Sequence, residues 1–301
     1  MSSLSTTFWA AQVVVALALA TPAFAAPLYQ VDLQATANSG GVFDGSTPAL
    51  SDSNPVSLAE LRNVDSTTGF GSAAAGPGSV AVIGSSTYTV TDPNNDTDAT
   101  GIGTAISTID DVIFSGSGFL NNVFLNLDLS GLMDVSGITD TAQSSLTLSV
   151  KLGNQTLNGF RTLQIPSLFF ADGELDGVWP QGQTSFDGAI AFGPFDNVPT
   201  GVPLSLRMSM SMFTGTGIFA VSSNGDSSSA VGDLGSTLSF TSSGDLFSGV
   251  PGSVDSAQGN IANNVWTGSP VTALPIPEPS SLMILAAAAM IASKRRREVG
   301  P

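Results

Sequence analysis

The sequence predicts an all-β protein, an antiparallel β-sandwich or jelly-roll-like domain with one apolar helix at each end of the chain. Three observations lead to this fold class. Apolar and polar residues alternate with a period of two over long stretches, clusters of Gly, Asn, Asp and Ser separate these stretches, and helix-forming apolar runs occur only near the two termini. Strands that follow one another without helical crossovers form antiparallel sheets.

Three long stretches alternate most regularly. In each of them one side of the strand is apolar and the other is polar, so one face is buried and the other meets water. Their apolar positions are Val123, Leu125, Leu127 and Leu129 in the first, Leu146, Leu148, Val150 and Leu152 in the second, and Val202, Leu204, Leu206, Met208, Met210 and Met212 in the third. We interpret the three methionines as core residues rather than as a ligand-binding set.

Shorter alternating or apolar stretches complete the predicted sheets. They span residues 29–35, 80–90, 106–114, 163–170, 189–192, 218–221 and 238–241. Residues 56–61 are expected to form a short helical turn. Together these elements predict a single domain over residues 26–266, followed by a linker at residues 267–274.

The chain contains no cysteine and no histidine. Disulfides, structural zinc sites, haem attachment and catalysis with a histidine base are therefore excluded. Carboxylates, hydroxyls, a few amines and main-chain groups remain for any reaction. Apart from Ca²⁺, no cofactor is expected.

The charges are unevenly distributed along the chain. Four of the eight basic residues stand together at residues 294–297. Residues 26–277 keep 22 acidic and four basic side chains, because only Glu278 and Glu298 of the 24 acidic residues lie outside this range. So acidic a body repels phosphate backbones, and no nucleic-acid partner is expected. Cations, neutral glycans and other hydroxyl-rich polymers suit it better.

The N-terminus has the pattern of a secretory signal. Residues 8–20 form a nearly uninterrupted apolar run, and small residues stand at Ala23 and Ala25, the positions that a signal peptidase reads. We therefore expect a signal helix within residues 1–25, export of the protein, and cleavage after Ala25.

The C-terminus combines a proline-rich segment, a short apolar helix and a basic cluster. Alternate prolines at residues 275–279 exclude a helix there, so the predicted transmembrane helix spans residues 280–293. As a helix these 14 residues would be about 21 Å long, whereas a bilayer core is roughly 30 Å thick, which suits a temporary anchor. Its end is held at the cytoplasmic face by the basic residues Lys294, Arg295, Arg296 and Arg297.

This segment resembles the PEP-CTERM sorting signal of exosortase-containing Gram-negative bacteria. The resemblance covers residues 275–298 and rests on the tripeptide Pro277, Glu278 and Pro279, followed in order by two serines, the apolar helix and the basic cluster. It implies transient retention in the inner membrane, recognition by an exosortase and removal of the tail. The mature protein would then reach the cell surface or the extracellular polymer. An ordinary tail anchor is the alternative interpretation.

One acidic loop is a candidate calcium site. Asp92, Asn94, Asp96 and Asp98 place oxygen ligands at every second position, as calcium loops do. Measured against an EF-hand loop, Thr97 stands where glycine is needed and Gly103 where a bidentate glutamate is needed. A strand-linking turn, which also favours Asp and Asn, is the alternative.

A second acidic loop contains Asp172, Glu174, Asp176 and Trp179. Neighbouring carboxylates could serve as acid and base in sugar hydrolysis, and the indole could stack on a pyranose ring. Glycan contact, a further calcium loop and an ordinary acidic surface loop are the other interpretations.

These observations predict a non-enzymatic surface or extracellular-matrix protein with a structural or biofilm role. A signal peptidase and an exosortase are its expected processing partners, and extracellular polysaccharide is an expected partner of the mature form. A calcium-dependent glycan-binding or adhesive module is the first alternative, and a two-carboxylate glycosidase is the second.

Overall fold

The computed structural model describes residues 26–39, 42–89, 97–137, 141–165, 169–172, 185–217 and 227–275. Within these ranges every helix or strand found is a β-strand, so the all-β prediction is confirmed. This part of the chain contains no helix that is long and apolar enough to cross a membrane. The predicted signal helix and the predicted transmembrane helix both lie outside the described residues.

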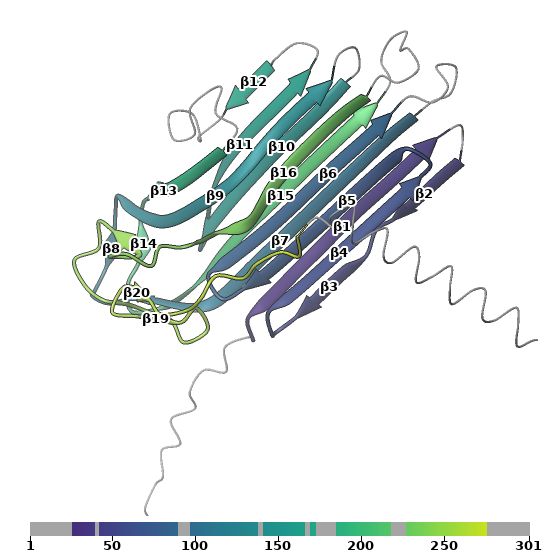
Figure 1. Cartoon of the computed structure of the whole chain (residues 1–301). Coiled ribbons are helices and arrows are strands. Elements are labelled where there is room, and N and C mark those ends of the chain that lie inside the picture. Colours follow the sequence, from purple (N-terminus) through teal and green to yellow (C-terminus); the bar gives the residue numbers. More distant parts are fainter. Residues whose placement is uncertain are drawn as a thin grey trace, which may run out of the picture.

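Two large antiparallel sheets lie face to face, which is consistent with the predicted β-sandwich (Figure 1). The nine-stranded sheet has the order β12-β11-β10-β15-β7-β1-β2, with β3 also paired to β1 and β18 to β7. Its strands are β1 (Leu28–Ser39), β2 (Val42–Ser46), β3 (Ala49–Asp52), β7 (Thr97–Phe114), β10 (Thr141–Leu152), β11 (Gln155–Ile165), β12 (Phe169–Asp172), β15 (Pro203–Gly217) and β18 (Val254–Asp255).

The seven-stranded sheet has the order β13-β9-β16-β6-β5-β4, with β17 also paired to β9. Its strands are β4 (Val56–Val64), β5 (Thr67–Gly76), β6 (Ser79–Thr89), β9 (Val123–Gly137), β13 (Ser185–Phe195), β16 (Ser227–Phe240) and β17 (Phe247–Ser248). Two short pairs close the fold, β8 (Phe119–Leu120) with β14 (Val198–Pro199), and β19 (Ile261–Ala262) with β20 (Val265–Trp266).

The three long alternating stretches form the strands β9, β10 and β15, as predicted. Their apolar sides supply much of the core between the sheets, and the methionines at 208, 210 and 212 are fully buried in it. Val202 is the exception. It precedes β15 and is 45% exposed, because the strand begins only at Pro203.

The helical turn predicted for residues 56–61 is wrong. These residues belong to β4, which pairs antiparallel with β5 along its whole length, from Val56 opposite Ala75 to Val64 opposite Thr67. The apolar spacing in this segment does not distinguish a helical turn from an edge strand, and pairing with β5 decides in favour of the strand.

Glycines let the two sheets approach closely at one side of the sandwich. A Cβ atom built on Gly101 of β7 would lie 2.0 Å from the main-chain oxygen of Phe70 and 2.5 Å from that of Ser85. Similarly, a Cβ atom on Gly69 of β5 would lie 2.2 Å from the main-chain oxygen of Thr36. No residue other than glycine fits there, because backbone atoms of the opposite sheet occupy the space of the side chain.

The C-terminal elements β18 to β20 are fixed to the nine-stranded sheet by Asp111 of β7, which is buried. Its carboxylate accepts a short hydrogen bond from the hydroxyl of Ser256 and bonds of 3.0 Å from the main-chain N–H groups of Ala257 and Gln258. Buried carboxylates need such partners, and this one is satisfied by the loop that it holds.

Candidate functional sites

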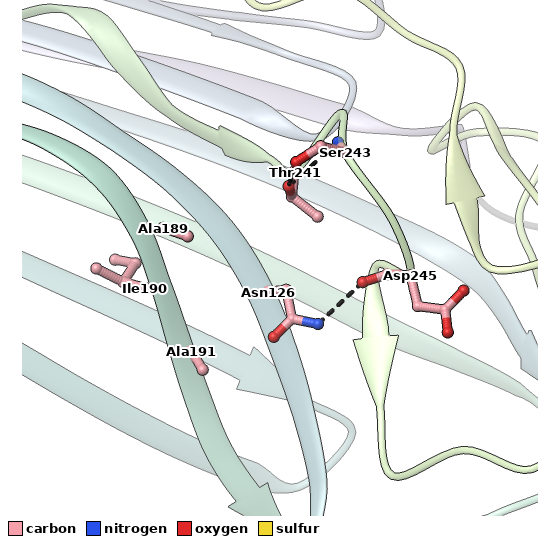
Figure 2. Close-up of a pocket in the computed structure, with 7 residues that line it drawn as sticks. All are labelled: Asn126, Ala189, Ile190, Ala191, Thr241, Ser243 and Asp245. Atoms are coloured by element: carbon pink, nitrogen blue, oxygen red, sulfur yellow. Dashed lines mark hydrogen bonds between the residues drawn. The ribbon is translucent and has the colours of Figure 1, made fainter.

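A polar groove lies on the seven-stranded sheet beside β9 and β13 (Figure 2). It has a volume of about 330 Å³. Its walls come from two strands and from the loop that follows β16, and they consist of Asn126, Ala189, Ile190, Ala191, Thr241, Ser243 and Asp245.

Hydrogen bonds hold the loop of residues 241–245 along β9. The side-chain amide of Asn126 donates to the main-chain oxygen of Asp245 at 2.9 Å, as Figure 2 shows, and the Thr241 N–H donates to the main-chain oxygen of Asn126 at 3.3 Å. The hydroxyls of Thr241 and Ser243 lie 3.4 Å apart beside them. The groove thus offers two hydroxyls and an amide, which can hydrogen-bond a hydroxylated ligand, whereas the carboxylate of Asp245 points away from the other residues labelled in Figure 2.

This groove could not be predicted from the sequence. Its polar residues lie far apart in the chain, and the loop itself is a run of Ser, Gly and Asp with no recognisable motif. A glycosidase site here would need a second carboxylate beside Asp245.

The predicted calcium loop is described only at its end. Asp92, Asn94 and Asp96 lie outside the described residues. Asp98 lies in β7, opposite Asn38 of β1, and its carboxylate accepts a 2.8 Å hydrogen bond from the Asn38 amide. Among the described residues, no group of three or more acidic side chains is arranged to hold a metal ion.

The second predicted loop is also described only at its start. Asp172 ends β12, where the register places it directly opposite Arg161 of β11. Arg161 is fully buried on the inner side of the sheet. Glu174, Asp176 and Trp179, the proposed carboxylate partners and stacking indole, lie outside the described residues.

One tyrosine next to Asp111 has a perturbed ionisation. Tyr29 of β1 is buried, and this burial together with the nearby charge of Asp111 raises the pKa of its hydroxyl to about 12. Both effects disfavour the tyrosinate anion. We regard this pair as part of the core around β18 and not as a reactive site.

Residues 267–275 continue from β20 as a strap on the outer face of the seven-stranded sheet. The N–H of Val271 donates to the hydroxyl of Ser79 at 2.7 Å, and the Val271 side chain fills the space above Gly76. Residues 267–274 are predicted to be a linker, and the structure places them in contact with β5 and β6.

The strap also covers an apolar strip on that outer face. Ala273 is 3% exposed, and it packs with four buried residues that point away from the nine-stranded sheet, namely Phe70, Ala74, Ala81 and Ile83. The described chain therefore stays on the body of the domain until the point where the proline-rich tail begins.

A protein-family model matches the chain at that point. The model describes the PEP-CTERM protein-sorting motif, and it matches residues 275–297. The chain carries a PEP-CTERM domain. The match includes the tripeptide of Pro277, Glu278 and Pro279 and the basic cluster, although these residues, like Ala23 and Ala25 of the predicted signal cleavage site, lie outside the described part of the structure. A PEP-CTERM domain implies an exported protein with a membrane-associated precursor that is processed by an exosortase.

Other comparisons add little to the PEP-CTERM match. No curated protein matches the sequence. A solved structure described as "Structural basis for the promiscuous specificity of the carbohydrate-binding modules from the beta-sandwich super family" is similar at 11% identity, over 68% of this chain and 83% of that chain, with a TM-score of 0.16. A likeness at this TM-score carries no argument about function.

Proposed function

We propose that the protein is a non-enzymatic component of the cell surface or extracellular matrix, delivered as a folded β-domain when an exosortase removes its PEP-CTERM tail. The signal peptide directs export, the apolar helix at residues 280–293 retains the precursor in the inner membrane, and the basic cluster at residues 294–297 stops it there. The role of the mature domain is structural, for example in a biofilm.

The observation that carries this proposal is the position of the sorting motif relative to the domain. The family match starts at Pro275, and Ala273, two residues earlier, is still buried against β5 and β6. Cleavage within the motif therefore leaves every described strand and the strap in the mature product. A structural role is further supported by the closely packed sheets, since an interface without room for side chains resists deformation.

The test is the mass and location of the protein in an exosortase-containing Gram-negative host. We expect a species that lacks both the first 25 residues and the tail, found outside the inner membrane. Glu278→Ala should leave a tailed precursor in the inner membrane, because it changes the central residue of the tripeptide.

Glu298→Ala is the matched control, since it removes the same charge just beyond the basic cluster, and it should be processed like the wild type. A full-length tail that stays in the inner membrane in all three proteins would refute the proposal. The protein would then be a simple membrane-anchored β-domain.

A further inference from the structure

The outer face of the nine-stranded sheet carries two cations side by side. Lys151 of β10 and Arg207 of β15 stand directly opposite each other in the register, and both side chains are exposed. Their strand neighbours Leu152 and Leu206 are buried in the core, so the two cations share the opposite, outer face. Opposite Cβ atoms lie about 5 Å apart in such a pair, which places both charges in one small patch.

This pair differs from the other basic residues of the domain. Residues 26–277 contain only four basic side chains, and the other two are engaged within the fold. Arg62 forms ion pairs with Glu60 and Asp44, and Arg161 is fully buried. In the part of the chain that the structure describes, Lys151 and Arg207 form no ion pair.

Like charges that face each other across a sheet repel, so the pair is unfavourable for folding by itself. An anion bound between the two side chains would remove this repulsion and accept hydrogen bonds from both. The repulsion and the exposure together indicate a site for one anionic group.

The residues beside the pair are uncharged and extend it into a row across five strands. We define this cation row as the five outer-face residues in register, Thr156, Lys151, Arg207, Thr108 and Leu28. Hydroxyls therefore flank the two cations on both sides.

Further hydroxyls follow the cation row along the same strands. Ser149 and Ser209 stand opposite each other two residues away, and Thr147 and Ser211 two residues further. The hydroxyl of Ser211 lies 2.9 Å from that of Thr104 on β7. In sheet geometry these rows are about 6.6 Å apart along the strands and about 4.8 Å apart across them.

One exposed aromatic ring completes this surface. Phe160 of β11 stands opposite Thr147 and is 43% exposed on the same face. The surface thus combines a single cationic site, a regular array of hydroxyls and an exposed ring.

We infer that this face binds a polysaccharide that carries carboxylate groups, with one carboxylate held between Lys151 and Arg207. Sugar hydroxyls would exchange hydrogen bonds with the serine and threonine rows, and the C–H face of a sugar ring would pack on Phe160. Nucleic acid fits poorly, because its dense phosphates would meet two cations on a domain with 22 acidic residues. The overall acidity favours neutral polymers, and the cation row adds a local site for isolated negative charges.

The inference deepens the proposed function by naming a partner of the mature protein, but its test does not depend on sorting. The test measures binding of the purified processed protein to a sparsely charged polygalacturonate, in which isolated free-acid units stand among methyl esters (the free-acid polymer), and to the same polymer with all its carboxylates methyl-esterified (the ester). We expect binding to the free-acid polymer that weakens as sodium chloride is added, and weak or no binding to the ester.

Replacing both cations, as Lys151→Gln with Arg207→Gln, should weaken binding to the free acid by about tenfold or more, since two charge-assisted contacts are lost. Lys151→Arg keeps the charge and should keep the binding. Arg62→Gln is the control for loss of a positive charge elsewhere, and the melting temperature of each variant shows that it is folded.

Several outcomes would overturn the inference. Binding to free acid that survives the double substitution would show that the cation row is not the site. An equal loss in Arg62→Gln would show a general effect of net charge. Equal binding to the methyl ester would remove the role of the carboxylate, and equally tight binding to duplex DNA would make the row a general anion site.

Discussion

Replacing Gly101 by alanine tests whether the close approach of the two sheets is required for stability. The added Cβ atom would lie 2.0 Å from the Phe70 main-chain oxygen and 2.5 Å from that of Ser85, whereas ordinary contacts begin at 3.4 Å. Both obstacles are backbone atoms, so relief requires the sheets to move apart locally by about 1 Å or more. Overpacking of this kind costs about 3 kcal/mol at the upper end of its usual range.

The same substitution has a small favourable effect in the unfolded chain. Alanine has less backbone freedom than glycine, which returns roughly 0.5 to 1 kcal/mol. The net loss for Gly101→Ala is therefore about 2 kcal/mol. For a domain of this size that corresponds to a fall in melting temperature of about 4 to 8 °C.

The assay is thermal unfolding of the processed protein, followed by circular dichroism, with Gly215→Ala as the matched control. Gly215 is also a strand glycine, but it lies on the outer face, and its added Cβ atom would meet only the ring tip of Phe213, 2.9 Å away. This ring can rotate away, so the control should melt at or slightly above the wild-type temperature. If both variants melt at the same temperature, the close approach has no energetic importance and the reasoning is wrong.

Three other predictions concern the residues that hold the C-terminal segment in place and the tyrosine beside Asp111. Asp111→Asn should leave one or more donors of the 254–266 segment unpaired and cost about 1 to 3 kcal/mol, seen as faster hydrogen exchange in that segment than in the wild type. Tyr29 should ionise near pH 12, and because its folded pKa is raised above the unfolded value, stability should fall as pH rises from about 10 to 12. Tyr29→Phe should abolish that part of the pH dependence. If the stability of this variant falls with pH as in the wild type, the fall is not due to Tyr29. Ser79→Ala should remove the acceptor of the Val271 N–H and increase protease cutting of the strap, at a cost of about 1 kcal/mol, while unchanged cutting would show that this bond does not hold the strap.

The alternating strands could be predicted from the sequence because each buries one continuous apolar side. This is the case for β9, β10 and β15, whose inward residues are Leu, Val and Met. The strands β4 and β5 could not be predicted in this way. On β5 the inward positions are glycine and alanine, whose suitability depends on how closely the opposite sheet approaches, and that distance is not encoded locally.

The candidate sites also differ in whether they could be predicted from the sequence. The PEP-CTERM domain could be recognised because its parts are consecutive in the chain. The groove beside Asn126 and the cation row could not, since each is assembled by strand pairing from residues far apart. Lys151 and Arg207 are 56 positions apart, and only the register of β10 with β15 makes them neighbours.

The strap has a consequence for how the precursor sits on the membrane. Six residues, 274–279, separate Ala273, which is buried against the domain, from Ser280 at the start of the predicted apolar helix, so the connection can reach at most about 20 Å. The strand β7, with 18 residues, is about 60 Å long. A body so much longer than its tether has little freedom to turn over. We therefore expect the outer face of the seven-stranded sheet, which carries the strap, to lie nearer the bilayer before cleavage than the cation row on the opposite side.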